Sequence, residues 1–414
     1  MVRRRLGTAF FVLAALAGSA STVACAAVFG FERLSVDDDA VDGPVGGEGS
    51  TEGGADTAAP PDSSSRCAEL GLPNKPGPSS TTALAPIHMA LKLFDLGIDT
   101  NGAVPGFNLD HVCSPTVATS SCKTNVSEAK FGTYARDRNG DGLDNSGYGL
   151  LAYLAYLGEA FQPVQVNKRL ANGEFGFVVR LVSWNGTPED DDVLVEVFPT
   201  IGVALDPDAS TPVVGGKPKF DAADRYIRDR RFQNIVDASR LKSASAYVTG
   251  GRLVASFDAV SLPMSVPDDQ KPLDIIIQEG ILYGSLVKDG ASWKLADGVL
   301  AGRWRTADIL AQVRTIFVKD TIGLKNVYLC DPDLMVNGVK IDPYKAVKTE
   351  VCDGRDLRAS SADDNKGLGC QAVSAGIRFD SYAVSTPGTF GDRPAIAARC
   401  QKPGSVPEGD DCAP

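Results

Sequence analysis

Between residues 175 and 379 apolar and polar side chains alternate in many short stretches, and glycine-rich turns separate these stretches. A period of two is typical of strands that bury one face. Thr249-Gly250-Gly251 lies between two such stretches and predicts a hairpin, because glycine accepts a positive φ. We therefore expect a mainly β fold, an antiparallel β-sandwich or a barrel-like domain with a few short helices, stapled by disulfides. The alternating stretches are 175–181, 193–197, 244–248, 253–257, 273–277, 281–287, 293–295 and 373–379.

Few segments have a helical pattern. After Thr306, which we expect to be an N-cap, apolar residues recur at Ile309, Leu310 and Val313 with a helical period. The run 148–157 is apolar almost all round, which predicts a buried helix or strand. The fold class therefore depends on the strands.

The first 24 residues have the layout of a signal peptide. Arg3, Arg4 and Arg5 form a positive start, and an uncharged, largely apolar run follows as far as Val23. Its hydrophobic centre is shorter than the roughly 20 residues that a membrane span needs. Because the uncharged stretch continues to Phe31, an uncleaved anchor is the alternative.

The segment Thr22-Val23-Ala24-Cys25 resembles the bacterial lipobox, in which a cysteine is lipidated and becomes the mature N-terminus. The resemblance implies lipidation of Cys25 and contact with a membrane through the N-terminal lipid. Ala26 is not the aspartate that resembles an inner-membrane retention signal, so we expect an outer-membrane lipoprotein. The pattern departs at Thr22, where leucine is preferred. The alternative is ordinary cleavage beside Cys25, which gives a secreted or periplasmic protein.

Residues 25–66 are expected to form a lipid-anchored N-terminus and a disordered acidic linker. From 37 to 66 there are eight acids and one base among small and polar residues, with too little apolar surface to fold. Residues 67–414 are expected to form the β-rich extracytoplasmic domain, either as one body or as two lobes with a seam near 206–218. The net charge is −11, and no basic cluster stands out, which argues against a nucleic-acid partner.

Eight cysteines follow Cys25, an even number without the spacing of a zinc site. In an exported protein this pattern predicts disulfides. Proximity favours a bond between Cys113 and Cys122, with further bonds inside the C-terminal group, and a bond from Cys67 to that group would join the ends of the domain. The eight are Cys67, Cys113, Cys122, Cys330, Cys352, Cys370, Cys400 and Cys412.

One short motif carries chemistry of its own, a DxNxDG pattern that begins at Asp137. It places oxygen-bearing side chains at alternate positions, and Gly142 permits a sharp turn around a hard cation. The motif resembles the calcium loop of EF-hands, dockerins and thrombospondin type 3 repeats, and the resemblance implies a structural Ca²⁺. Tyr148 stands where an EF-hand has its last glutamate, so another acid must complete the shell. The expected ligands are Asp137, Asn139, Asp141, the carbonyl of Leu143, Asn145 and Asp144. The alternative is a solvated turn.

The sequence contains no complete catalytic motif. It has no nucleophile elbow, and its two histidines, His88 and His111, are expected to be packing or loop residues. We therefore favour a non-enzymatic protein with a ligand-binding or structural role at the cell surface, where the partner is a carbohydrate or another surface ligand. The alternative is a secreted hydrolase that acts on polysaccharide through paired carboxylates.

Several segments together resemble lipoproteins of myxobacterial type whose function is unknown. They are residues 106–110 (GFNLD), 141–145 (DGLDN), 183–186 (SWNG) and 298–304 (GVLAGRW). The resemblance spans most of residues 80–385. It implies an exported lipoprotein and implies no activity.

Overall fold

The computed structural model describes residues 71–79, 82–95, 104–113, 116–127, 135–136, 142–157, 162–206, 213–233, 241–264, 273–318, 327–331, 334–336, 339–385, 388–393, 400, 404–407 and 409–412. All of them belong to one compact unit, residues 58–414. The predicted signal peptide, Cys25, the acidic linker and Cys67 lie outside the described residues.

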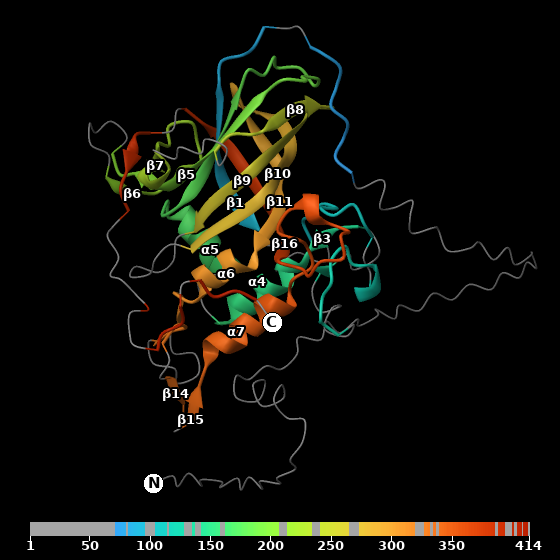
Figure 1. The fold of residues 1–414 in the computed structure, drawn as a ribbon. Helices are drawn as coiled ribbons and strands as arrows, with labels where there is room; N and C mark the ends of the chain where they lie inside the picture. Colours follow the sequence, from blue (N-terminus) through green and yellow to red (C-terminus); the bar gives the residue numbers. More distant parts are fainter. Residues whose placement is uncertain are drawn as a thin grey trace, which may run out of the picture. The chain divides into compact units, whose positions relative to one another are not determined.

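Eight antiparallel strands form a curled sheet (Figure 1). Each strand of the eight except the third pairs with the next one along the chain, and the last pairs with the first. The remaining gap closes beside the start of the third strand, where Asp190 and Val248 exchange backbone hydrogen bonds of 2.9 and 2.7 Å and Glu196 bridges to Lys242. The expected mainly β, antiparallel fold is therefore confirmed, and the sheet takes the form of a barrel. Its strands are β1 (Ile87–Asp95), β4 (Gly176–Val182), β5 (Leu194–Ala204), β8 (Ser245–Thr249), β9 (Arg252–Met264), β10 (Leu273–Asp289), β11 (Ser292–Arg305) and β16 (Ala372–Val384).

Strand β5 has two neighbours along one edge. Its first half faces residues 241–248, which close the barrel, and its second half pairs with β7 (Tyr226–Asp229), which lies outside the barrel. Strand β17 (Phe390–Gly391) pairs with β7 in parallel, and β6 (Val214–Gly216) pairs with the end of β5. The segment that carries β6 and β7 therefore covers part of the outer wall. Three small pairs complete the strands: β2 (Ala135–Arg136) with β3 (Asp144–Asn145), β12 (Phe317–Val318) with β13 (Val327–Tyr328), and β14 (Leu334–Val336) with β15 (Val339–Ile341).

Alternate side chains of the strands fill the barrel. Phe177 of β4 and Phe379 of β16 meet edge to face, with 5.4 Å between their ring centres. A Cβ atom on Gly298 would lie 2.5 Å from the Phe379 ring, so glycine makes room for that ring. The hydroxyl of Ser381 accepts from the amide of Leu295 at 2.7 Å and donates to its carbonyl at 2.9 Å. His88, Arg180 and Arg228 of these and neighbouring strands line a surface hollow instead.

The α-helices of the described residues lie together beyond one end of the barrel strands (Figure 1). The helix expected after Thr306 is confirmed, and Ile309, Leu310 and Val313 are fully buried. The expected cap is wrong, because Arg305 occupies the N-cap position and the hydroxyl of Thr306 donates to the carbonyl of Gln371 at 3.0 Å. The helices are α4 (Ser146–Leu157), α5 (Pro163–Ala171), α6 (Thr306–Val313) and α7 (Pro343–Asp353), and short 3₁₀ turns lie at Val117–Thr119, Arg230–Phe232 and Ser361–Asp363.

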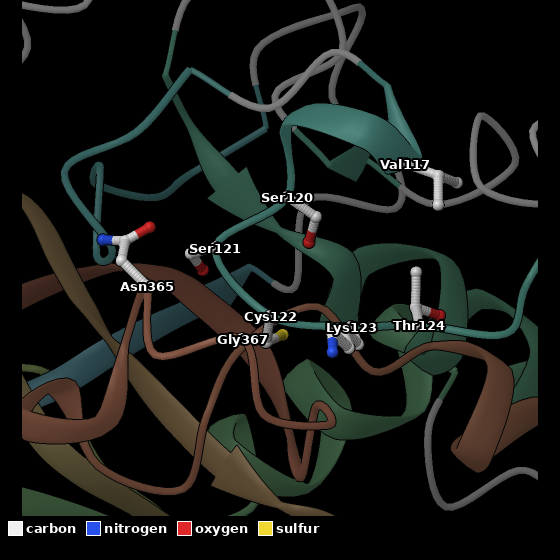
Figure 2. Close-up of a pocket in the computed structure, with 8 residues that line it drawn as sticks. All are labelled: Val117, Ser120, Ser121, Cys122, Lys123, Thr124, Asn365 and Gly367. Atoms are coloured by element: carbon white, nitrogen blue, oxygen red, sulfur yellow. The ribbon is translucent and has the colours of Figure 1, made fainter.

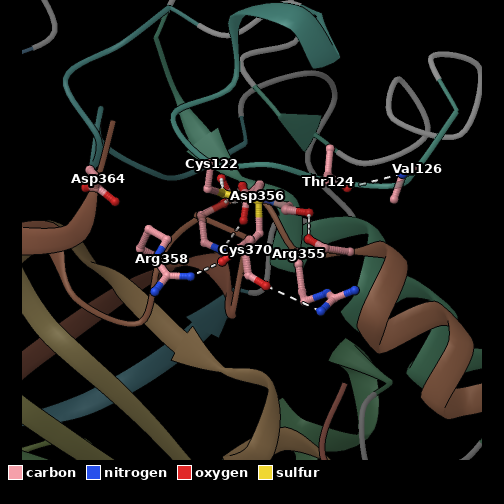
Figure 3. The surroundings of a disulfide bond; sticks show 12 residues. Cys122, Thr124, Val126, Arg355, Asp356, Arg358, Asp364 and Cys370 are labelled. Carbon is pink, nitrogen blue, oxygen red and sulfur yellow. Dashed lines mark hydrogen bonds between the residues drawn. A yellow bond between two sulfur atoms is a disulfide. The ribbon is translucent and has the colours of Figure 1, made fainter. Parts of the chain in front are cut away.

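Disulfides form as predicted, but two predicted pairings are wrong. One is Cys113 with Cys122, and the other is Cys67 with the C-terminal group, whose five cysteines all bond to other partners. Cys122 bonds to Cys370 and not to Cys113, which is also disulfide-bonded. The backbone explains this choice, because the amide of Lys123 donates to the carbonyl of Leu368 and the amide of Cys370 donates to the carbonyl of Lys123. Figure 3 shows the surroundings of the Cys122–Cys370 bond. Two further bonds lie inside the C-terminal group as expected, Cys330 with Cys400 and Cys352 with Cys412. The guanidinium of Arg355 donates to the carbonyls of Cys352, Cys370 and Cys412, which holds two of these bridges near each other.

Candidate functional site

Two hollows stand out on the described surface. The smaller one, the loop pocket, has a volume of about 360 Å³ and is formed by residues 117–124 and the turn at 365–367 (Figure 2). The larger one, the arginine cleft, has a volume of about 650 Å³ and lies on the outer wall of the barrel beside β7. The residues lining the arginine cleft are Pro86, His88, Arg180, Phe198, Ala222, Arg228, Ser292, Ala383, Val384 and Ser385.

The loop pocket is polar and has one cationic side chain. Figure 2 shows Ser120, Lys123, Thr124 and Asn365 around it, and Cys122 at its base belongs to a disulfide. The amide of Asn365 donates to the carbonyl of Ser121 at 2.9 Å, so the hollow lies where two loops are fastened together. Its walls are loops, and its geometry selects no particular ligand.

The pairing of the strands places the polar residues of the arginine cleft opposite one another. His88 of β1 lies opposite Val384 of β16 on one side and opposite Arg180 of β4 on the other. Arg180 in turn lies opposite Glu196 of β5, and Glu196 bridges to Lys242. Side chains directly opposite each other on one face of a sheet are neighbours. A single row across five adjacent segments of the barrel wall therefore carries an imidazole, a guanidinium and a carboxylate.

A second guanidinium reaches the cleft from outside the barrel. Arg228 of β7 lies opposite Thr200, and its Nε donates to the carbonyl of Gly388 at 3.0 Å. Its guanidinium carbon lies 4.0 Å from the ring centre of Phe390 and 5.5 Å from that of Phe198. Two aromatic rings and one carbonyl thus fix the guanidinium plane without neutralising its charge.

Positive charge dominates the cleft. Arg180 Nη1 donates to Glu196 at 2.8 Å, and Lys242 lies 3.6 Å from the same carboxylate, so Glu196 is shared by two cations. Burial and then the positive charge of Arg180 lower the pKa of Arg228, and Glu196 opposes this shift. Among the described residues, Nη2 of Arg180 and both Nη groups of Arg228 make no hydrogen bond within the protein. The cleft therefore presents unused guanidinium donors, which are suited to a carboxylate or phosphate group.

The pKa of His88 responds to the same charges. Burial lowers it first and Arg180 lowers it further, while Glu196 and a hydrogen bond to the Ser385 backbone raise it. The imidazole is therefore neutral at neutral pH. The rest of the lining is largely apolar, with Phe198, Val384 and Pro86 among it. A ligand that fits has a negative head and an apolar body.

The structure describes half of the expected calcium ligands. Asp137, Asn139 and Asp141 lie outside the described residues. Asp144 is buried and its Oδ2 accepts from the amide of Leu109 at 2.7 Å, while Asn145 Oδ1 accepts from the amide of Tyr148 in the first turn of α4 at 3.0 Å. The amide group of Asn145 also donates to the carbonyls of Pro105 and Gly376. These bonds give Asp144 and Asn145 a role in the fold, Leu143 precedes them, and the calcium site stays a prediction.

Neither hollow is lined by a carboxylate. Over the described ranges, no three His, Cys, Asp or Glu side chains gather as a metal would require. Sequence reasoning considered His88 and expected a packing role, and it did not single out Arg180 or Arg228. One signal was present, because Arg180 is the only charged residue in the apolar alternation from Phe175 to Leu181.

Comparisons of the chain with protein-family models, with curated proteins and with solved structures found no match. In the described part of the chain, no helix combines the length and the apolar character needed to cross a membrane. The disulfides indicate an oxidising, extracytoplasmic setting.

Proposed function

We propose that the chain is an extracytoplasmic ligand-binding protein whose arginine cleft takes a small amphipathic anion. The observation that carries this proposal is the pair of guanidinium groups, Arg180 and Arg228, which line one hollow and keep unused donors, while only Arg180 pairs with an acid, Glu196. An acidic protein with a net charge of −11 gains nothing in solubility from a positive hollow. A negative ligand explains why these arginines lie together.

The chemistry of the cleft favours a carboxylate or phosphate head joined to an apolar body. Arg228 lies against Phe390 and Phe198 and uses only its Nε within the protein, which leaves its Nη donors to pair with the oxygens of an anion. Phe198, Val384 and Pro86 offer apolar surface beside that head. Burying such surface contributes roughly 25 cal/mol for each Å², so the body of the ligand adds affinity while the head sets its orientation.

The proposed location is the cell envelope, with the protein anchored through lipid on Cys25, as in an outer-membrane lipoprotein. The positive start, the apolar run and the lipobox-like segment before Cys25 support this proposal. The acidic residues from 37 to 66 would then hold the barrel away from a lipid surface as a flexible tether, with an r.m.s. reach of roughly 30 Å. A cleft on the barrel wall suits a protein that captures a ligand at that surface.

The test is direct binding of benzoate and of hexanoate to the purified protein, measured by calorimetry or by chemical-shift perturbation. We expect saturable binding that Arg228→Gln weakens about tenfold or more, because a charge-assisted hydrogen bond contributes about 1.5–3 kcal/mol. Arg180→Gln should weaken binding similarly. Arg225→Gln is the matched control, because Arg225 is exposed and lies just before β7, three residues from Arg228. Binding that survives both cleft substitutions, or that Arg225→Gln weakens equally, would remove the proposal.

A further inference from the structure

We propose that binding of an anion in the arginine cleft is coupled to protonation of His88, so that the protein takes up its ligand at acidic pH and releases it as the pH rises. This inference rests on the proposed function of the cleft. It concerns the one titratable group of the lining whose charge changes near neutral pH.

The geometry places the imidazole inside the same positive row as the anion donors. His88 lies directly opposite Arg180 across the β1–β4 pair, and it lines the hollow together with Arg228. On its other side it faces Val384 of β16, and the Ser385 backbone hydrogen-bonds to it. An anion held by Arg180 and Arg228 therefore lies in the same hollow as the imidazole.

The charged groups around His88 explain why the free protein keeps it neutral. Arg180 comes from β4, Arg228 from β7 and Glu196 from β5, and Lys242 contacts Glu196 from the segment before β8. On the side of β10, Asp289 accepts from the amide of Ala383, one residue before Val384. Two guanidiniums and partial burial outweigh the single carboxylate in the row, and the pKa of His88 is therefore lowered.

The sign of the coupling follows from this balance. A bound anion adds negative charge to the hollow, which favours the imidazolium and raises the pKa of His88 in the complex above its value in the free protein. Between these two pKa values, binding takes up a proton. Affinity must then rise as the pH falls, by at most about tenfold for each pH unit when one proton is involved. His88 thereby adds a third cation to a site that holds two guanidiniums.

Benzoate is a suitable probe because a simple carboxylic acid has a pKa near that of Glu, about 4.3, and stays ionised above about pH 5.5. Its affinity is measured from pH 8 to pH 5.5 for the wild-type protein, for His88→Gln and for His111→Gln. His111 is exposed and lines neither hollow, so it is the matched control. We expect affinity to rise at least about threefold towards pH 5.5 in the wild type and in His111→Gln, and to stay nearly constant in His88→Gln.

A second measurement leaves His88 in place and needs only the control variant. The chain has two histidines, so imidazole labelling gives two resonances, and His111→Gln identifies the one from His88. Its titration midpoint should lie below 6.5 in the free protein and should move up when benzoate saturates the cleft. Binding without pH dependence, or with a pH dependence that His88→Gln retains, would overturn the coupling and leave the ligand site intact. Absence of binding to benzoate and hexanoate at every pH would overturn the proposed function itself.

Discussion

Arg303 is a buried charged side chain whose three guanidinium nitrogens all bind other groups of the protein. It projects from the outer face of β11, and its side chain is 2% exposed. Nε lies 2.9 Å from Glu279, Nη1 donates to Asp364 and to the carbonyl of Arg358, and Nη2 donates to Asp364 and to the carbonyl of Leu109. A buried charge is tolerated when its donors are satisfied in this way. Arg303 therefore fastens the loops around 109 and 358–364 to the barrel wall.

Arg303→Ala should lower the free energy of unfolding by about 3–5 kcal/mol, because it leaves the Asp364 carboxylate and two carbonyls without their donor. Arg303→Lys should recover only part of this loss, since a single ammonium cannot reproduce the planar fork. Urea unfolding measures the difference. Arg305→Ala is the control on the same strand, because Arg305 is exposed and its pair with Asp308 contributes less than about 1 kcal/mol. Equal losses for the alanine variants at 303 and 305 would contradict this role.

Arg180 and Arg303 also show where sequence reasoning stops at the residue scale. Arg180 interrupts the apolar stretch 175–181, which indicates an outward side chain, and it lines the cleft, whereas Arg303 lies outside the alternating stretches. The pattern does not reveal that loops cover one of them while the other lines an open cleft. The residues around each arginine make the difference. Asp364 and Leu109 bind Arg303, and Arg228 lines the cleft beside Arg180. Each of these neighbours is at least 48 residues away in the sequence, so no local spacing predicts it.

At the scale of elements, local signals were reliable and long-range pairings were not. Thr249-Gly250-Gly251 predicted a hairpin, and β8 and β9 join there with φ values of 55° and 72° at the two glycines. The segment 373–379 was expected to be a strand and is the centre of β16. Closure of the barrel between residues 190–197 and 241–248 could not be predicted, because it depends on how far the whole sheet curls. The register that places His88 opposite Arg180 could not be predicted for the same reason.

The Cys122–Cys370 bridge should stabilise the fold more than the Cys352–Cys412 bridge. It joins residues 248 apart in the sequence, whereas Cys352–Cys412 joins residues 60 apart. Loop-closure entropy then favours the longer bridge by about 1 kcal/mol, within a total of roughly 2–5 kcal/mol for each bridge. We expect the Cys122→Ser, Cys370→Ser double variant to unfold more readily in urea than the Cys352→Ser, Cys412→Ser double variant. Peptide mapping without reduction should recover residue 122 linked to residue 370, and a link from 122 to 113 would contradict the fold.

At the scale of the whole molecule, charge is divided between parts with different roles. Residues 37–66 carry eight acids, and the barrel wall carries a compact positive hollow. If these residues form the proposed acidic tether, they would lower the local concentration of free anions, and a ligand would then need matched geometry as well as charge. The apolar surface beside Arg228 supplies that geometry. The proposed anchor and the proposed site would together serve one purpose, the capture of a ligand at a surface.

We expect the lipid on Cys25 to determine membrane partition without affecting the stability or the ligand affinity of the barrel. With wild-type protein we expect partition into the detergent phase on phase separation, and an N-terminal peptide beginning at Cys25 whose mass includes acyl chains. Cys25→Ser should move the protein to the aqueous phase while its urea unfolding and its benzoate affinity stay unchanged, because neither depends on the anchor. Ser21→Ala is the control, since it alters the same leader and keeps the cysteine. Wild-type protein in the aqueous phase with an unmodified N-terminus would instead establish ordinary cleavage and a secreted or periplasmic protein, and the cleft would then act in solution.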